Sequence, residues 1–225
     1  MELNESTLQV LKNFSGINQN LLIRSGNTIK TISEARNVLA TAVVDQEFPN
    51  DFGVYDLNEF ISVLSLVDTP RLKFEDEHVV IGDSSGRSKV KYFFSSEETL
   101  TTPQKDINMP DADVAFALDN DTLNKLKRAA SALGHSEVSI SGKDGVLSLS
   151  VVDTQNSTSN TFSIDVDGEF KPDVVFNFVL NIGNLKILPG DYEVQISSKL
   201  ITQFKHKELN VRYWIALEKS STFGV

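Results

Sequence analysis

The clearest hydrophobic pattern in the chain lies between residues 119 and 133. Its apolar residues return every three or four positions and are Leu123, Leu126, Ala130 and Leu133. This spacing is typical of the buried stripe of an α-helix. Asp119 or Asp121 can cap the first turn, because a carboxylate oxygen accepts a hydrogen bond from a backbone N–H that has no partner inside the helix. The pattern predicts a capped, amphipathic helix.

The opposite face of this helix is basic and polar. At about 100° per residue, Arg128 points almost directly away from the apolar stripe. Asn124, Lys125 and Ser131 flank Arg128, and Lys127 lies at the edge. The whole chain carries a formal charge of -10, so a basic face is unexpected. It is either a solvated surface or a binding surface for an anion, and the pattern alone leaves both open.

Two more helices are predicted in the first half of the chain. Residues 3–14 fit a short strand end followed by a helix that Ser6 caps, and residues 55–67 fit a helix that Asp56 caps and Pro70 closes. Alternating runs separated by turns predict the strands of this half. These strands cover residues 21–25, 28–32, 38–44, 71–75, 78–81 and 88–94.

The second half of the chain repeats this order. Residues 118–126 align with residues 3–11 at a constant offset of 115 positions, which places Arg128 on Asn13. A short helix is predicted over 181–187. Strands are predicted at 137–141, 146–152, 161–166, 192–197, 200–205 and 211–217. The chain is therefore an internal duplication, in which each half contains a helix, three strands, a second helix and three strands.

A stretch without periodicity joins the two halves. Residues 97–113 contain two prolines and many acidic residues, as is typical of an extended connector. We therefore expect a first domain over residues 1–100, a connector over 101–113 and a second domain over 114–225.

Composition limits the classes of function. The chain has 225 residues and no cysteine, which excludes disulfides and thiolate metal sites and favours an intracellular, reducing setting. Met1 to Ser6 lack the basic and apolar regions of a secretory signal, and no apolar run approaches the ~20 residues of a membrane span. The charge of -10 argues against nucleic-acid binding over the whole surface, because phosphate repels such a surface, but it allows one basic patch.

No motif indicates an active site, a cofactor or a metal. Gly82 to Gly86 matches the G-x-S-x-G pattern around Ser84, but a predicted strand follows where a nucleophile elbow needs a helix. Asp165 to Gly168 resembles the start of a calcium loop without its later ligands. The three histidines lie far apart, which favours solvated or structural roles over a shared metal; they are His78, His135 and His206.

Longer matches point to one family. The matching segments are Leu11 to Phe14, Ile17-Asn18, Ser25-Gly26, Val54 to Val67 and Phe176 to Tyr192. Through these segments the chain resembles, over essentially its full length, the DNA polymerase sliding clamps of T-even-type bacteriophages. Gln155 to Lys171 matches less well. The resemblance implies an α+β fold of two tandem, similar domains of the DNA-clamp type, with helices that line a ring and antiparallel sheets outside them.

The resemblance also implies partners and a function. A clamp of this kind encircles duplex DNA without reading its sequence and tethers the replicative DNA polymerase, which makes synthesis processive. It would form a homotrimer joined head to tail through sheet edges, and an ATP-dependent clamp loader would place it on DNA. The resemblance implies no enzymatic activity and no cofactor. It further implies a place in the cytoplasm of the infected bacterial host and support of phage late transcription.

Two sets of site residues follow from the resemblance. The DNA-facing residues would be Lys12, Lys125, Lys127, Arg128, Lys186, Gln9, Asn13, Asn58 and Asn124. A pocket for partner peptides would lie near the connector and involve Ile107, Met109, Leu200, Ile201, Ile215 and Leu217. For the strand residues of this second set, simple core packing is the alternative interpretation.

Two other functions stay open on the sequence alone. A structural or interaction protein of the virion, built from duplicated β-rich domains, would account for the acidity and for the lack of an active site. It would not account for the basic helix face. A hydrolase that uses Ser84 is the other alternative.

Overall fold

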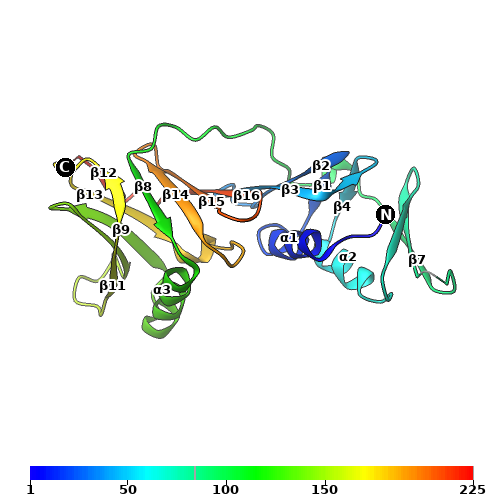
Figure 1. Ribbon diagram of the computed structural model, residues 1–225, viewed down its shortest axis with the longest axis horizontal. Helices are drawn as coiled ribbons and strands as arrows, with labels where there is room; N and C mark the ends of the chain where they lie inside the picture. Colours follow the sequence, from blue (N-terminus) through cyan, green and yellow to red (C-terminus); the bar gives the residue numbers. More distant parts are fainter. Residues whose placement is uncertain (84, 225) are drawn as a thin grey trace. The chain divides into compact units, whose positions relative to one another are not determined.

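The computed structural model describes residues 1–83 and 85–224, and Figure 1 shows their helices and strands. Contacts divide the chain into unit 1, Met1–Asp106, and unit 2, Ile107–Val225. This division falls inside the stretch that the sequence assigns to a connector. Ser84, the candidate hydrolase nucleophile, lies outside the described residues. Among the described residues, no helix is long and apolar enough to cross a membrane.

Unit 1 contains two helices, α1 (Glu5–Ser15) and α2 (Leu57–Leu64), which pack against each other. The cap of α1 differs from the prediction, because Asn4 Oδ1 rather than Ser6 accepts from a first-turn backbone N–H at 2.8 Å. Ser6 lies inside the first turn, where its hydroxyl donates to Asn4. Asp56 caps α2 as predicted, by accepting from two backbone N–H groups of its first turn.

The strands of unit 1 form two antiparallel groups. One has the order β3-β2-β1-β4 and comprises β1 (Leu21–Ile23), β2 (Gly26–Ile32), β3 (Val38–Phe48) and β4 (Phe52–Val54). The other has the order β5-β6-β7 and comprises β5 (Arg71–Phe74), β6 (His78–Gly82) and β7 (Lys89–Phe93). A 3₁₀ turn, η1 (Glu97–Thr99), follows. The sequence pattern misses β4, because all of its residues are buried and no alternation marks it.

Unit 2 contains the helix α3 (Asn120–Leu133), which packs against β10 and β11. One antiparallel group has the order β12-β8-β14-β15-β16 and comprises β8 (Val114–Leu118), β12 (Gly168–Phe170), β14 (Tyr192–Ser197), β15 (Ile201–His206) and β16 (Val211–Ala216). The other has the order β11-β10-β9-β13-β17 and comprises β9 (Glu137–Lys143), β10 (Val146–Val152), β11 (Phe162–Val166), β13 (Phe176–Asn181) and β17 (Thr222–Phe223). The sequence pattern misses β8, β12, β13 and β17.

The helix predicted over 181–187 does not form. A 3₁₀ turn, η2 (Ile182–Asn184), stands there instead, and Asn181 Oδ1 accepts from the backbone N–H of Gly183 at 2.9 Å. Strand β13 occupies the chain up to Asn181, and Gly183, Pro189 and Gly190 disfavour an α-helix in the residues before the next strand. In its described residues, unit 2 therefore has a single α-helix where unit 1 has two, and the duplication is looser than the sequence predicts.

Candidate nucleic-acid interface

Contacts at both ends of helix α3 and along its apolar stripe fix its orientation. Asp119 Oδ1 accepts from the backbone N–H of Thr122 at 2.6 Å and so caps the first turn. At the other end Gly134 has a φ of 69°, a left-handed conformation that ends the helix at little cost for glycine. Between these ends the apolar stripe, including Leu123 and Leu126, is buried. The opposite face is thereby held toward solvent.

The exposed face of α3 carries the basic residues that the sequence places there. Asn124, Lys125 and Arg128 are exposed. Lys125 Nζ forms an ion pair with Asp121 at 2.5 Å, one helical turn away, which offsets part of its charge. Arg128 makes no ion pair within the described ranges. Arg128 is therefore the most available cation on this face.

Lys127 differs from its two neighbours because it is half-buried. Burial lowers the pKa of its ammonium group, since removal from water disfavours the charged form. None of the ion pairs among residues 1–83 and 85–224 includes Lys127. Its aliphatic stem covers apolar surface while its charge reaches toward solvent, as is usual for lysine at the border of a helix face.

Helix α1 occupies the place in unit 1 that α3 occupies in unit 2. Its cap, Asn4, precedes the α3 cap, Asp119, by the offset of 115 positions found in the sequence. Leu11 and Phe14 are buried. On the other side Gln9 and Lys12 are exposed and Asn13 is half-buried.

The two remaining predicted DNA-facing residues lie on other elements. Asn58 is exposed on α2, whose last turn contains no basic residue. Lys186 is exposed between buried Leu185 and Ile187, just after η2. The largest group of predicted residues on one exposed face is Asn124, Lys125 and Arg128, so the candidate site is concentrated on α3.

The predicted pocket for partner peptides needs a correction. Ile215 and Leu217 are buried, with 0% and 6% of their surface exposed, so they belong to the core of unit 2 and cannot line an open pocket. Leu200 and Ile201 are exposed or half-exposed, as are Ile107 and Met109 in the connector. For Ile215 and Leu217, burial agrees with the alternative interpretation of simple core packing.

Comparisons with known proteins agree with this arrangement of elements. The family described as DNA polymerase processivity factor matches residues 4–100, and the family described as gp45 sliding clamp, C terminal, matches residues 115–219. The sliding clamp of Vibrio phage KVP40 is 35% identical over 223 residues, which cover 97% of this chain and 99% of that protein. The chain belongs to the sliding clamp family. It is a clamp of the DNA polymerase processivity factor type.

Other clamps show the same full-length correspondence. The sliding clamp of Escherichia phage RB69 is 33% identical and that of Enterobacteria phage T4 is 29% identical, each over 99% of both chains. Two solved structures share the fold at low identity. A PCNA2-PCNA3 complex from Sulfolobus tokodaii aligns with a TM-score of 0.66 at 13% identity, over 95% of this chain and 96% of the other. Proliferating Cellular Nuclear Antigen from Entamoeba histolytica aligns with a TM-score of 0.67 at 15% identity, over 94% of each chain.

Proposed function

We propose that this clamp closes into a head-to-tail homotrimer around duplex DNA, with the exposed faces of α1, α2 and α3 toward the phosphates. The observation that carries this proposal is the basic face of α3 on a chain with a net charge of -10. An acidic exterior repels DNA, whereas a local group of cations attracts it. The duplex is then favoured at one surface of the protein only.

The chemistry of this surface suits sliding rather than reading. Lys125 and Arg128 offer charge to phosphate oxygens, which are the same for every sequence. Lys127 and Lys12 add charge at the border and on α1, and Lys186 adds a further cation after η2. The polar contacts would come from Gln9, Asn13, Asn58 and Asn124. Contacts to phosphate position a protein on DNA without selecting a base, so movement along the duplex meets no sequence barrier.

The number of available cations also favours weak, transient contacts. Each neutralised phosphate contributes a slope of about 0.9 to the dependence of log affinity on log salt concentration. A subunit with few free cations therefore binds weakly, and retention on DNA comes from the closed ring.

The proposed ring catalyses no reaction itself. It tethers the replicative DNA polymerase, and a separate ATP-dependent clamp loader opens and closes it on DNA. Partner peptides would dock near the connector, at Ile107, Met109, Leu200 and Ile201, where side chains remain accessible. The setting is the cytoplasm of an infected bacterium. Support of phage late transcription stays a prediction.

Primer extension on a long single-stranded template tests the proposal. The polymerase is supplied in limiting amount with its clamp loader and ATP, and product length is measured with and without the clamp. We expect the clamp to lengthen the products made in one binding event. Unchanged product length with an active loader and polymerase would contradict the assignment as a processivity factor in this system.

A further inference from the structure

A strap of chain lies along one face of unit 1. It comprises residues 97–106, from η1 to the end of the unit. At one end Arg24 Nη2 contacts Glu97 Oε1 at 2.6 Å, and at the other Lys30 Nζ contacts Asp106 Oδ1 at 2.5 Å. The two carboxylate side chains are 49% and 76% exposed, and ion pairs this exposed stabilise a structure only weakly. Both ends of the strap can therefore be displaced at little cost.

The middle of the strap is held more firmly. Asn18 Nδ2 donates to the carbonyl oxygen of Thr101 at 3.0 Å and to that of Ile32 at 2.9 Å. Asn20 Oδ1 accepts from the backbone N–H of Thr101 at 2.9 Å. Asn18 is buried, and a hydrogen bond is stronger in such a site than in water. The strap thus has a fixed centre at Thr101 and two exchangeable ends.

A cavity of about 350 Å³ lies between this strap and the sheet of unit 1. Ile23 of β1 is paired with Ile29 of β2, and both side chains are buried. Because side chains alternate along a strand, the residues on either side of these two face away from the core. They form one wall of the cavity, and the strap forms another. The lining includes Leu22, Arg24, Thr28, Lys30, Thr102 and Pro103.

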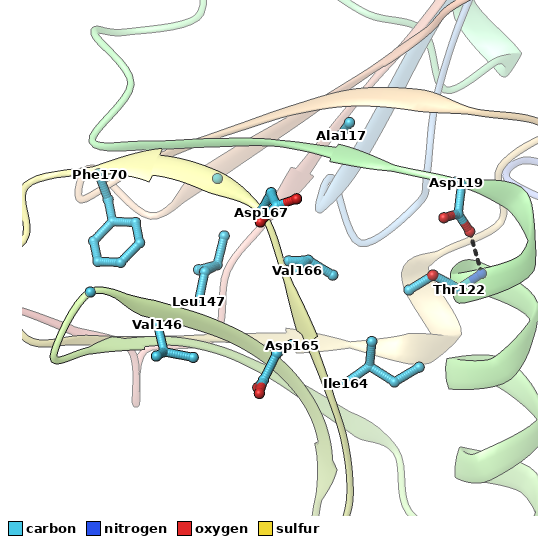
Figure 2. A pocket seen from close by; sticks show the side chains of 12 residues that line it. Ala117, Asp119, Thr122, Val146, Leu147, Ile164, Asp165, Val166, Asp167 and Phe170 are labelled. Carbon is cyan, nitrogen blue, oxygen red and sulfur yellow. Dashed lines mark hydrogen bonds between the residues drawn. The ribbon is translucent and has the colours of Figure 1, made fainter.

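The charge of this cavity is opposite to that of a larger cavity in unit 2. The larger cavity has a volume of about 680 Å³ and lies beside β11 and the start of α3 (Figure 2). Its lining residues, all within the described ranges, include the carboxylates of Asp119, Asp165 and Asp167 and no cation. In the strap cavity the charged lining residues are Arg24 and Lys30. Opposite charges attract, so the strap cavity is the one that suits anionic groups.

The strap itself shows which anions the two cations accept. Glu97 and Asp106 are carboxylates on one stretch of chain, and each meets one cation. Arg24 does not depend on Glu97 for its position, because its Nη1 also contacts Asp51 Oδ2 at 2.8 Å. Asp51 Oδ1 in turn accepts from the backbone N–H of Ser25 at 2.7 Å, and this bond and Arg24 hold the pKa of Asp51 below its usual range. The Arg24 cation is therefore preformed, while the strap carboxylates are exchangeable.

We propose that this cavity docks an acidic segment of a partner protein and that the strap is its built-in competitor. One carboxylate of the partner replaces Glu97 at Arg24, and a second replaces Asp106 at Lys30. The inference goes beyond the proposed ring, because the site lies wholly in unit 1. It shares no residue with the region of the connector and β15 proposed above for partner peptides.

The same face also offers an apolar contact. Leu22 is partly exposed, and Val43 of β3 is 37% exposed. Val43 is paired with Thr28, so its side chain lies on the same face as the cavity residues. A partner segment that carries an apolar side chain beside its carboxylates therefore matches the site.

Duplex DNA fits this site less well than an acidic protein segment. DNA carries one negative charge per about 1.7 Å of its axis, so its phosphates extend well beyond two cations. The exposed carboxylates of Asp51, Glu97 and Asp106 repel the phosphates that find no cation. A segment with two spaced carboxylates places its charge only where Arg24 and Lys30 lie.

A peptide with the strap's own sequence, residues 95–106, serves as the probe. It carries fluorescein, and fluorescence anisotropy measures its affinity for the full-length clamp. The variant Glu97→Gln with Asp106→Asn removes the internal carboxylates, and we expect it to bind the peptide about tenfold more tightly than the unmodified clamp. Asn20→Ala loosens the centre of the strap and should also raise the affinity. The matched control, Arg24→Gln with Lys30→Gln, should lose binding, as should a peptide whose acidic residues are replaced by amides.

Each other result would overturn part of the proposal. If neither strap variant binds the peptide more tightly than the unmodified clamp, the strap is not a competitor. Binding that survives Arg24→Gln with Lys30→Gln would show that the cavity is not the site. Displacement of the probe by a duplex oligonucleotide at lower concentration than by unlabelled peptide would assign the site to nucleic acid instead. Circular dichroism checks that every variant is folded.

Discussion

At the scale of single residues, Asp119 links the stability of α3 to its function as a support for cations. Its carboxylate accepts from the backbone N–H of Thr122, and this bond holds the pKa of Asp119 below its usual range. We expect Asp119→Ala to lower the free energy of unfolding by about 1 kcal/mol, whereas Asp119→Asn, which keeps an acceptor, changes it little. Urea denaturation of both variants measures the difference, and an equal loss in both would contradict the capping role.

The lowered pKa also sets the sign of the pH dependence. A carboxyl group with a folded pKa below its unfolded value stabilises the fold above the unfolded pKa, and this contribution disappears as pH falls through the folded pKa. The destabilisation caused by Asp119→Ala should therefore be full at neutral pH and shrink in acid. Because Asp119 is exposed, solvent screens its charge and the shift with pH is expected to be modest.

His206 is the buried histidine, and its ring organises the turn after β15. Nδ1 accepts from the backbone N–H groups of Glu208 and Leu209 at 3.1 Å each, and Nε2 lies 3.1 Å from the carbonyl oxygen of Pro189. His206→Phe would fill the space and remove both acceptor contacts. Both bonds are partly buried, and a hydrogen bond of this kind contributes about 0.5–1.5 kcal/mol to stability.

We therefore expect His206→Phe to lower the midpoint of urea unfolding clearly. His135→Ala provides the comparison, because the His135 side chain makes a single hydrogen bond in the described structure, between Nε2 and the carbonyl oxygen of Asn160. A midpoint for His206→Phe as high as that of the unmodified clamp would show that the turn does not depend on this ring.

At the scale of elements, the helices separate what the sequence can predict from what it cannot. α3 has a cap, a full apolar stripe and a terminal glycine, so local signals agree and its bounds are predicted closely. The segment after Asn181 has apolar residues at helical spacing, but Gly183 lies inside it and Pro189 follows, so only a 3₁₀ turn forms there. Buried strands such as β13 lack alternation, so sequence patterns miss them.

The same physics explains the mixed outcome for the site residues. On a helix the apolar stripe defines the opposite face, so the exposure of Lys125 and Arg128 could be predicted. On β16 the consecutive buried residues Tyr213, Trp214 and Ile215 give no alternation from which to choose the outer face. Which strand residues line a pocket depends on contacts far apart in sequence, and these cannot be derived from one chain alone.

The uneven charge of the helices leads to a prediction about α3. The double variant Lys125→Glu with Arg128→Glu reverses two charges on α3, and we expect it to shorten the polymerase products. It should also reduce the slope of log affinity against log salt concentration by the amount that two phosphate contacts contribute. Lys12→Glu on α1 is the matched control and should have the smaller effect, since it removes one cation. Circular dichroism checks that the helices persist. Equal effects of the two variants would show that charge on α3 is not special.

At the scale of the whole molecule, the net negative charge and the closure of the proposed ring both affect how the clamp is held on DNA. A chain with a charge of -10 binds DNA poorly through its surface as a whole. Copies of such a chain also repel one another through their acidic surfaces. Salt weakens both the repulsion of DNA and the repulsion between copies, because exposed charges are screened over about 8–10 Å at physiological ionic strength.

Retention on DNA distinguishes a closed ring from direct binding. A clamp loaded onto a nicked circular plasmid should remain bound at a salt concentration that abolishes ordinary phosphate contacts, because leaving requires the ring to open rather than ions to exchange. Cutting the plasmid once should release it, since a ring that does not read bases slides off a free end. Gel filtration of loaded complexes before and after cutting measures the bound fraction. Retention on the linear plasmid equal to that on the circle would mean that the clamp is held by surface charge and not by topology.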